Sequence, residues 1–180
     1  MARLDVLFEG YGNEAGVAGT VSLLRDAGIV AVVDPGMVPV RASILDPLRA
    51  LGVPPEDVTD VILSHHHPDH TVNIALFPNV TIHDHWATYR NDQWTPRAAE
   101  GVRLTPGITL LETPGHTPQD ITTLVETDEG VAALTHLWLH EGSPGSGLDV
   151  DATLVAEHRA RVLEVASLVV PGHGAPFRVT

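Results

Sequence analysis

Short apolar segments recur along the whole chain, and residues of the turn-forming types Gly, Pro, Asp and Asn separate them. Runs of this length between turn signals are typical of β-strands, whereas helices need longer segments with apolar residues every three or four positions. We therefore predict many strands and few helices. The strands are expected at residues 4–8, 20–24, 29–34, 58–64, 80–83, 108–113, 121–126, 131–137 and 168–170.

Residues 41–51 form the first of two segments with helical spacing. Their apolar positions are Ile44, Leu45, Leu48 and Leu51. Pro47 lies inside this segment, and a proline is tolerated best in the first turn of a helix, where its missing N–H is not needed. The pattern predicts a helix, in which Pro47 would fit best near the first turn.

Residues 151–165 form the second segment with helical spacing. Val155, Val162 and Val165 fall on one side of it, as expected for a helix that packs against a core. Asp151 stands at its start, where a side-chain oxygen can accept hydrogen bonds from the backbone N–H groups of the first turn. We predict a helix with Asp151 as its N-cap.

Strand segments outnumber helical ones and do not alternate with them, so packed sheets with helices outside are favoured over a doubly wound parallel sheet. No repeat or low-complexity tract divides the 180 residues, a length that suits one domain over residues 1–180. The glycine-rich residues 9–19 and the polar and aromatic residues 84–97 are expected to be long surface loops, where binding groups tend to lie.

Acidic residues exceed basic ones, and the formal net charge is −13. This charge repels phosphate backbones and anionic membrane surfaces at long range. A local cationic site would escape the argument, because bound metal ions would be the largest charges near it. A small-molecule substrate is therefore the expected partner, and nucleic acid is a disfavoured alternative. The pattern gives no indication of the oligomeric state.

The chain contains no cysteine, so disulfides and thiolate metal sites are absent. Apolar residues make up 43% of the chain, but no run approaches the roughly 18 residues that a membrane span needs. The first residues show no basic segment followed by an apolar run of the length of a signal peptide. We therefore expect a globular protein of the cytoplasm with no membrane partner.

The 11 histidines are concentrated in motifs, and the densest motif, Ser-His-His-His-Pro-Asp-His at 64–70, follows an apolar strand segment. Side chains two residues apart on an extended segment lie on one side, so His65 and His67 can converge on one metal ion. The proline turns the chain and lets Asp69 and His70 reach a second ion. Imidazoles and a carboxylate suit zinc, and also iron, copper or nickel. The alternative, a solvated histidine loop, is disfavoured by this spacing.

Two further histidines stand in turns after apolar strand segments. His116 lies in Thr-Pro-Gly-His-Thr at 113–117, and His173 lies in Pro-Gly-His-Gly at 171–174. Glycine beside each histidine permits unusual backbone angles and close approach, which a loop of metal ligands at a strand end requires. Alone, each motif could be an ordinary turn. Together with the cluster at 64–70, both histidines are predicted to be ligands.

These motifs, taken in their order along the chain, resemble the metallo-β-lactamase superfamily. The resemblance rests on Val-Asp-Pro-Gly at 33–36, His-X-His-X-Asp-His at 65–70, Pro-Gly-His-Thr at 114–117 and the final Pro-Gly-His-Gly at 171–174. It covers nearly the whole chain. It implies an α+β fold of the αββα type, in which helices flank two mixed β-sheets and the site lies along the edge between the sheets.

Three further segments are similar to the small metallo-β-lactamase-domain-containing proteins, whose vertebrate members are linked to histone pre-mRNA cleavage. They are Glu-Gly-Tyr at 9–11, Leu-Phe-Pro at 76–78 and residues 169–179. This similarity introduces nuclease activity as a minority alternative. The net charge of −13 opposes that alternative, because a nuclease must approach an anionic backbone.

The resemblance also implies two metal positions and their ligands. The ligands would be His65, His67 and His116 at one position and Asp69, His70 and His173 at the other. Asp34 matches a family aspartate that does not touch the metal but orients a ligand imidazole by hydrogen bonding, which is how such imidazoles are generally held.

One position departs from the family pattern. The family has an aspartate that bridges both metals, whereas residues 134–137 read Leu-Thr-His-Leu and place His136 there. A neutral imidazole offers one lone pair and cannot span two ions, so repulsion between ions about 3.5 to 4 Å apart should rise. We expect His136 to ligate one metal terminally, in a site with one ion or with a second ion held weakly. The alternative is that His136 faces the core or hydrogen-bonds nearby.

The resemblance implies a metal-dependent hydrolase, with zinc as the expected metal and iron or manganese as alternatives. The ion would lower the pKa of bound water to about 7, so that a metal-bound hydroxide attacks an ester, lactone, lactam or phosphodiester bond. Asp69 would both hold a metal and orient that water as the catalytic carboxylate. An alternative of another class is a metal-binding or ligand-sensing protein that lost efficient catalysis together with the bridging aspartate.

Overall fold

The structure is a computed structural model that describes residues 1–145 and 151–179, in which β-strands predominate. The strands are β1 (Arg3–Phe8), β2 (Tyr11–Asn13), β3 (Gly16–Ala18), β4 (Val21–Asp26), β5 (Ile29–Val33), β6 (Asp60–Ile62), β7 (Thr81–His83), β8 (Ala87–Arg90), β9 (Gln93–Pro96), β10 (Arg103–Thr105), β11 (Ile108–Glu112), β12 (Ile121–Thr127), β13 (Gly130–Thr135), β14 (Leu168–Pro171) and β15 (Phe177–Arg178). The helices are α1 (Ala42–Ala50), α2 (Pro68–Thr71) and α3 (Ala152–Leu163), with 3₁₀ turns η1 (Pro55–Asp57) and η2 (Ile74–Leu76).

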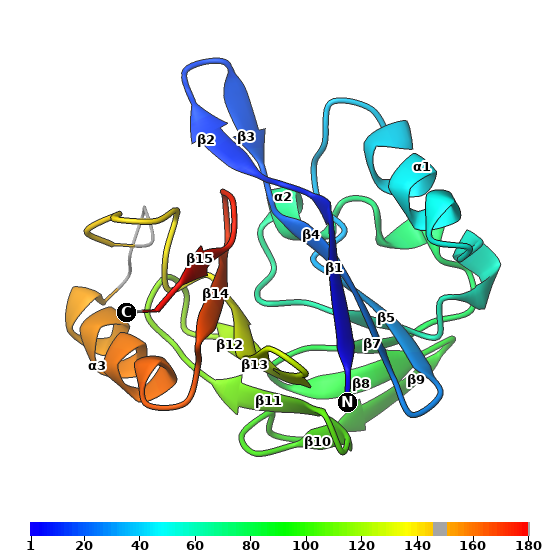
Figure 1. Cartoon of the computed structure of the whole chain (residues 1–180). Coiled ribbons are helices and arrows are strands. Elements are labelled where there is room, and N and C mark those ends of the chain that lie inside the picture. The colour runs from blue at the N-terminus through cyan, green and yellow to red at the C-terminus, as the bar shows by residue number, and fades with distance from the viewer. Residues whose placement is uncertain (146–150, 180) are drawn as a thin grey trace.

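The strands form two mixed sheets and a separate hairpin (Figure 1). The seven-stranded sheet has the order β1-β4-β5-β6-β7-β8-β9, and the six-stranded sheet has the order β10-β11-β12-β13-β14-β15. Strand β5 pairs with β6, β6 with β7, and β13 with β14 in parallel, while the other pairs are antiparallel. Helices α1 and α3 lie outside the two sheets. The αββα arrangement expected from the sequence is thereby confirmed.

Apolar side chains form three layers, because strands in the middle of the sheets are buried on both faces. On β6, Ile62 points between the sheets, where it packs in the central cluster with Leu110 of β11 and Leu134 of β13. Its neighbour Val61 points outward and packs in the cluster that contains Leu48 of α1. A third cluster packs α3 against the outer face of the six-stranded sheet. Burial on both faces explains why these strands are continuous apolar runs.

Every segment predicted to be a strand contains one, but the two predicted long loops are wrong. Residues 9–19 form the hairpin of β2 and β3, and residues 84–97 contain the hairpin of β8 and β9. Neither hairpin has an alternating apolar pattern, since most of its side chains are exposed or only half-buried. Backbone pairing therefore forms these strands without the signal that a buried face would give.

Helix α1 forms where the sequence predicts it, with Ile44 and Leu48 buried against the seven-stranded sheet. Pro47 lies inside the helix as predicted, but in its second turn and not near the first turn, where a proline fits best, because the helix begins at Ala42. A proline there cannot donate a hydrogen bond to the carbonyl four residues earlier. The packing of Ile44 and Leu48 against the sheet fixes the helix at this place despite that cost.

Helix α3 begins as predicted, because the Asp151 carboxylate accepts hydrogen bonds from the N–H groups of Thr153 and Leu154 at 2.9 and 3.1 Å. Val155 and Val162 are buried. Val165, expected on the same face, is 51% exposed, since the helix ends at Leu163 and the chain turns away before it. No helix in the described parts of the chain is long and apolar enough to cross a membrane.

A close approach of backbone segments sets the position of α2 relative to the sheet. The carbonyl of Asp69 accepts hydrogen bonds from the N–H groups of Gly19 and Met37, both at 3.1 Å. A side chain at Gly36 would overlap that carbonyl and the N–H of His70. Glycine at 36 thus allows the segment after β5 to lie directly against the short helix that bears two predicted ligands.

We predict that Gly36→Ala lowers the free energy of unfolding by about 1–3 kcal/mol, because the added methyl group overpacks a backbone contact that cannot move aside. The matched control is Gly12→Ala, since nothing lies within 4 Å of a Cβ at that position. Its effect should stay within about 0.5 kcal/mol. Urea unfolding of the metal-free proteins measures both values, and equal losses in the two variants would contradict the prediction.

Candidate metal centre

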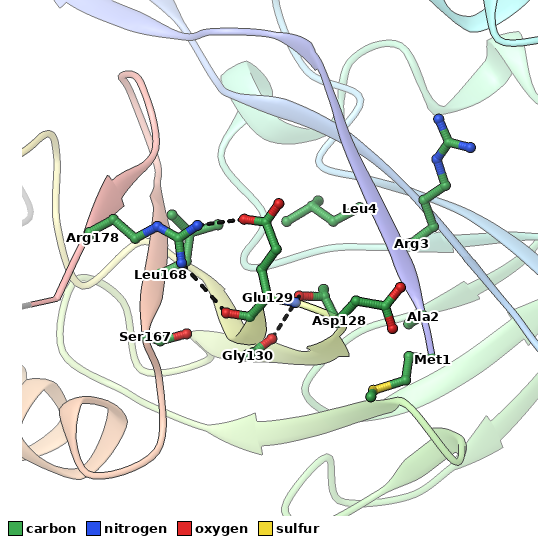
Figure 2. A pocket seen from close by; sticks show the side chains of 11 residues that line it. Met1, Ala2, Arg3, Leu4, Asp128, Glu129, Gly130, Ser167, Leu168 and Arg178 are labelled. Atoms are coloured by element: carbon green, nitrogen blue, oxygen red, sulfur yellow. Dashed lines mark hydrogen bonds and ion pairs between the residues drawn. The ribbon is translucent and has the colours of Figure 1, made fainter.

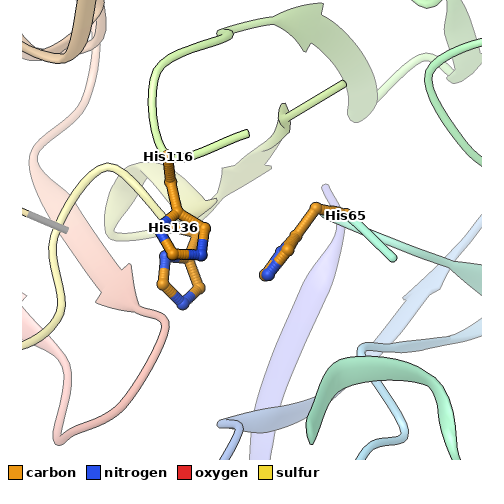
Figure 3. A group of neighbouring side chains, drawn as sticks. All are labelled: His65, His116 and His136. Carbon is orange, nitrogen blue, oxygen red and sulfur yellow. The ribbon is translucent and has the colours of Figure 1, made fainter. Parts of the chain in front are cut away.

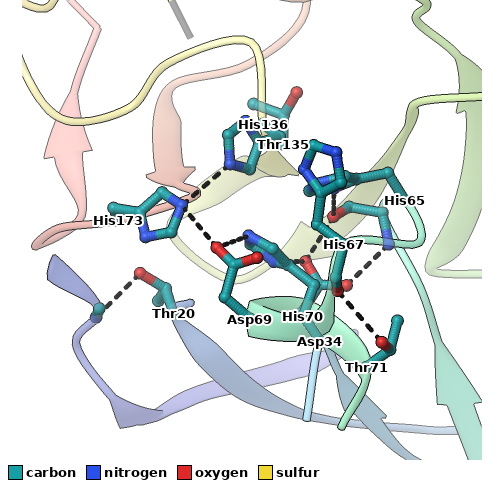
Figure 4. A network of polar contacts seen from close by, with 12 residues as sticks. Thr20, Asp34, His65, His67, Asp69, His70, Thr71, Thr135, His136 and His173 are labelled. Atoms are coloured by element: carbon teal, nitrogen blue, oxygen red, sulfur yellow. Dashed lines mark hydrogen bonds and ion pairs between the residues drawn. The ribbon is translucent and has the colours of Figure 1, made fainter. Parts of the chain in front are cut away.

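Asp34, predicted to orient a ligand, and several of the predicted metal ligands follow strand ends that meet at one edge of the sandwich. Asp34 and His65 come directly after β5 and soon after β6 in the seven-stranded sheet. His116, His136 and His173 follow β11, β13 and β14 in the six-stranded sheet. Side chains from both sheets point toward one another in this region (Figure 4). The centre therefore exists only because the two sheets face each other.

Three imidazoles form the first group of the centre. The Nδ1 atom of His67 lies 3.0 Å from Nε2 of His65 and 3.1 Å from Nε2 of His116. A tetrahedral zinc ion with Zn–N bonds of 2.0–2.1 Å would hold its ligand nitrogens about 3.3 to 3.4 Å apart. His65 and His116 are buried, whereas His67 is exposed. The group can thus hold one ion with small adjustments, and solvent reaches it from the side of His67.

A carboxylate and two imidazoles form the second group. The Oδ2 atom of Asp69 lies 3.5 Å from Nε2 of His70 and 3.4 Å from Nε2 of His173. His70 is fully buried, and its Nε2 atom has no hydrogen-bond partner among the described residues. A buried lone pair without a partner costs free energy, so a cation is the natural occupant of the space between these atoms.

His136 lies inside the centre and does not face the hydrophobic core. Its side chain is 3% exposed, and its ring stacks on that of His116 with centroids 4.1 Å apart and an interplanar angle of 24° (Figure 3). Its Nε2 atom is 3.1 Å from Nε2 of His173. His136 belongs to two groups of three imidazoles whose potential ligand atoms lie within 4.8 Å of one another. One group also contains His65 and His116, and the other also contains His70 and His173.

Asp34 holds the centre together from outside the ligand groups. Its backbone has a φ of 52°, in the left-handed region that aspartate and asparagine tolerate better than most residues. Its carboxylate accepts hydrogen bonds from the Ser64 N–H at 2.7 Å and the Ser64 hydroxyl at 2.6 Å. It also accepts one from Nδ1 of His70 at 3.0 Å. This is the geometry expected of the family aspartate that orients a ligand.

Hydrogen bonds also fix which nitrogen of each imidazole carries its proton. Nδ1 of His70 donates to Asp34, and Nδ1 of His173 donates to the carbonyl of Ala18 at 2.8 Å. The Ser64 hydroxyl donates to Asp34 and can therefore accept from Nδ1 of His65 at 3.0 Å. In each ring the Nε2 lone pair then faces the centre, as a metal ligand requires. The donor set therefore fits a divalent cation.

Burial disfavours the protonated form of four imidazoles of the centre. Loss of solvent, and then the proximity of the other imidazoles, lowers the pKa of His116 to about 4 and the pKa of His136 well below its usual value. Burial and the neighbouring imidazoles lower the pKa of His65 in the same way, and burial lowers that of His173. Metal binding needs neutral imidazoles, so the protein holds these ligands in the state that binds.

Asp120 positions the loop that carries His116, and the sequence motifs did not single it out. Its carboxylate accepts hydrogen bonds from the Thr117 N–H at 2.8 Å and the Thr117 hydroxyl at 2.5 Å. Burial raises the pKa of Asp120 to about 6 despite these bonds. The spacing Thr-x-x-Asp after a histidine, which allows such a local turn, is the signal that could have identified it.

Asp84 organises the segment next to the centre and was also missed. It accepts hydrogen bonds from the Tyr89 hydroxyl at 2.7 Å, from Nε2 of His66 at 3.0 Å and from the N–H groups of Trp86 and Ala87. Burial alone would raise the pKa of Asp84, but these hydrogen bonds outweigh it and lower the pKa to about 2. His66 therefore points away from its neighbours in the cluster and has a structural contact.

A separate pocket of about 440 Å³ lies near the N-terminus and is lined by residues of β1, the turn between β12 and β13, and β14 (Figure 2). Arg178 forms an ion pair with Glu129 beside it. None of the histidines lines this pocket. Its lining offers no converging lone pairs, so the histidine centre is the stronger candidate for the functional site.

Comparisons with known proteins identify the family of the chain. Residues 15–158 match the model of the metallo-β-lactamase superfamily. Metallo-β-lactamase domain-containing protein 1 of Xenopus laevis is 36% identical over 98% of this chain and 81% of its own length. The human protein of that name is 36% identical over 91% of this chain and 65% of its own length. An N-acyl homoserine lactonase of a Bacillus species is 29% identical over 72% of this chain and 61% of its own.

Solved structures share the fold over nearly the whole chain. A candidate metallo-β-lactamase of Thermotoga maritima superposes with a TM-score of 0.76 at 21% identity and covers 99% of both chains. A quorum-quenching N-acyl homoserine lactone lactonase superposes with a TM-score of 0.69 at 18% identity, covering 96% of this chain and 91% of that one. The family resemblance seen in the sequence motifs is confirmed, and this chain belongs to the metallo-β-lactamase superfamily.

Proposed function

We propose that the chain is a zinc-dependent hydrolase that acts on a small molecule at the histidine centre. The observation that carries the proposal is the convergence of His65, His67 and His116, whose nitrogens lie 3.0 and 3.1 Å apart on a side open to solvent. When bound there, zinc lowers the pKa of water to about 7 and polarises a carbonyl or phosphoryl oxygen. Three neutral nitrogen ligands leave room for a further ligand, as in catalytic zinc sites.

The chain supplies groups that hold and orient the reactants. Asp69 is 15% exposed in its side chain, so its carboxylate can accept a hydrogen bond from a water molecule at the open side and orient that water. Ser64 is not a candidate nucleophile, because its hydroxyl is 4% exposed and donates to Asp34. Since the chain also lacks cysteine, no thiol or exposed serine of this cluster competes for the role.

A lactone or another carboxylic ester is the substrate class that the relatives favour. A Bacillus relative is named an N-acyl homoserine lactonase, and it aligns with 72% of this chain. Lactams and small phosphodiesters use the same polarised-oxygen chemistry and remain within the proposal. A nucleic-acid substrate is opposed by the net charge of −13, because long-range repulsion would slow its approach.

The second candidate function is a metal-binding or ligand-sensing protein with little catalysis. The specific observation in its favour is His136, which stands inside the centre in place of a bridging carboxylate. Without that carboxylate, two ions carry less compensating charge, so an arrangement of two ions is harder to maintain. Zinc, iron and manganese all accept the imidazole and carboxylate donors present, so the active metal is part of the test.

A substrate panel separates the two candidates. Metal-free protein reconstituted with zinc, manganese or iron should hydrolyse at least one of a chromogenic ester, a lactone, a cephalosporin and bis-p-nitrophenyl phosphate. We expect activity on the lactone or the ester, lost on chelation and restored by one metal. Activity that is unaffected by chelation would contradict the hydrolase proposal, and silence across the panel with metal bound would favour the sensor.

Replacement of single ligands tests the assignment of the centre. His67→Ala and His116→Ala should each abolish turnover and weaken metal binding at the position that these two residues share. The loss of affinity should exceed the factor of about 10–100 that is typical when a hydrogen-bonding partner of a metal ligand is removed. His140→Ala is the control, since His140 is exposed and its Nδ1 faces the carbonyl of Glu141. Steady-state rates and metal content by mass spectrometry are the readouts. Full activity in either ligand variant would defeat the assignment.

Asp34→Asn tests the orienting role of Asp34. Asparagine keeps the shape of the side chain and tolerates the left-handed backbone, but it loses the charge that faces Nδ1 of His70. We expect metal affinity to fall by about 10–100-fold with the fold retained. Asp46→Asn on α1 serves as the control, because its carboxylate is 72% exposed. Calorimetric titration with zinc compares them, and equal affinities would remove Asp34 from the centre.

A further inference from the structure

We propose that His136 completes a closed metal position with Asp69, His70 and His173, which retains its ion, while the position of His65, His67 and His116 holds an ion that exchanges. This inference rests on the proposed function, because it concerns the same centre. It goes beyond that function by assigning different roles to the two positions. The position of His65, His67 and His116, here called the first position, would be the reactive one. The position of Asp69, His70, His136 and His173, called the second position, would stabilise the loops around it.

The distances bring four ligand atoms together at the second position. Nε2 of His136 lies 3.1 Å from Nε2 of His173. Oδ2 of Asp69 lies 3.4 Å from that same nitrogen and 3.5 Å from Nε2 of His70. Ligand atoms of His70, His136 and His173 all lie within 4.8 Å of one another. Four such donors match the tetrahedral set of a structural zinc site, in which no place stays open for an outside ligand.

The ring of His136 is fixed in the orientation that this position requires. A Cβ at Gly172 would overlap the ring and would lie 2.7 Å from Nε2, so only glycine leaves space for the imidazole there. The opposite support is His116, whose ring stacks on that of His136. Because one side of the His136 ring lies against Gly172, its Nε2 atom lies beside His173, the residue that follows Gly172.

The charges of the two positions also differ. Asp69 places a carboxylate at the second position, whereas the three ligands of the first position are neutral imidazoles. A divalent ion at the second position therefore gains one more donor and one compensating negative charge. A carboxylate at residue 136 would have shared its charge between both ions, but an imidazole favours one of them. The position with four ligands should therefore fill first and release its ion last.

Another assignment of His136 makes the opposite prediction. Its ligand atoms also lie within 4.8 Å of those of His65 and His116. If His136 joined them, the first position would be the closed one, with four imidazoles including His67, and it would retain its ion. The second position would then keep Asp69, His70 and His173 only. The two assignments therefore differ in which ligand variants lose the tightly bound ion.

Titration of the metal-free protein with Co²⁺ decides between them, because Co²⁺ absorbs strongly in the visible range when it has four ligands in a tetrahedron. In the wild-type protein, the first equivalent should give this absorption and the second should bind more weakly. His67→Ala and His173→Ala form the matched pair, since each removes one imidazole from one position. We expect His67→Ala to keep the strong first absorption and His173→Ala to lose it, with His140→Ala unchanged.

The reverse result, loss in His67→Ala and retention in His173→Ala, would overturn the inference. His136→Ala should weaken binding of the first equivalent by more than about 10–100-fold, and an unchanged titration of this variant would also overturn it. Circular dichroism checks folding. If His173→Ala does not fold, Asp69→Asn replaces it, because it removes the carboxylate from the second position only and leaves every imidazole in place.

Activity measured on the same samples keeps this inference separate from the proposed function. The expected order of metal binding without turnover on any substrate would leave the inference standing and remove the hydrolase. The opposite outcome is turnover in a protein whose tightly bound ion lies at the position of His67 and whose weakly bound ion lies at that of His173. This outcome would leave the hydrolase standing and remove the inference.

Discussion

The hydrogen bonds accepted by the buried carboxylate of Asp34 are the constraint on which the centre depends. They join three segments that are distant along the chain, since Asp34 directly follows β5, Ser64 follows β6 and His70 lies on α2. A charged acceptor bound by several donors in a buried place has few alternative arrangements. Through this carboxylate the edge of the seven-stranded sheet determines where the ligands stand and which nitrogen of His70 is free to bind.

The centre stores a cost that a metal ion would relieve. Nε2 of His70 faces the centre and is buried without a hydrogen-bond partner among the described residues. Burial also disfavours protonation of His116 and His136, so these imidazoles stay neutral and do not bind a proton in place of a metal ion. A ligand that binds the folded state and not the unfolded state stabilises the fold, so metal binding and folding should be coupled here. On the proposed assignment of His136 to the position of His173, that coupling is unequal between the two positions.

The local pattern of the sequence predicted most elements correctly, and its failures share one cause. Strands such as β6 and β13 are buried on both faces, so they appear as continuous apolar runs that any reading of hydropathy detects. The hairpins of β2 with β3 and of β8 with β9 have little buried surface, and their pairing leaves no apolar alternation. Pro47 lies beyond the first turn of α1, where local preference disfavours it, and the packing of Ile44 and Leu48 against the sheet offsets that preference.

For the centre, the sequence by itself determined the types and order of the candidate ligands and the departure at His136 from the pattern that it resembles, because these are properties of short motifs. It did not determine that His136 faces His173, and the roles of Asp120 and Asp84 were missed although most of their partners lie near them in the chain. The approach of His136 to His173 depends on the register of β13 with β14. Only the tertiary structure decides such distances, because atoms far apart in the chain converge through packing and not through local conformational preference.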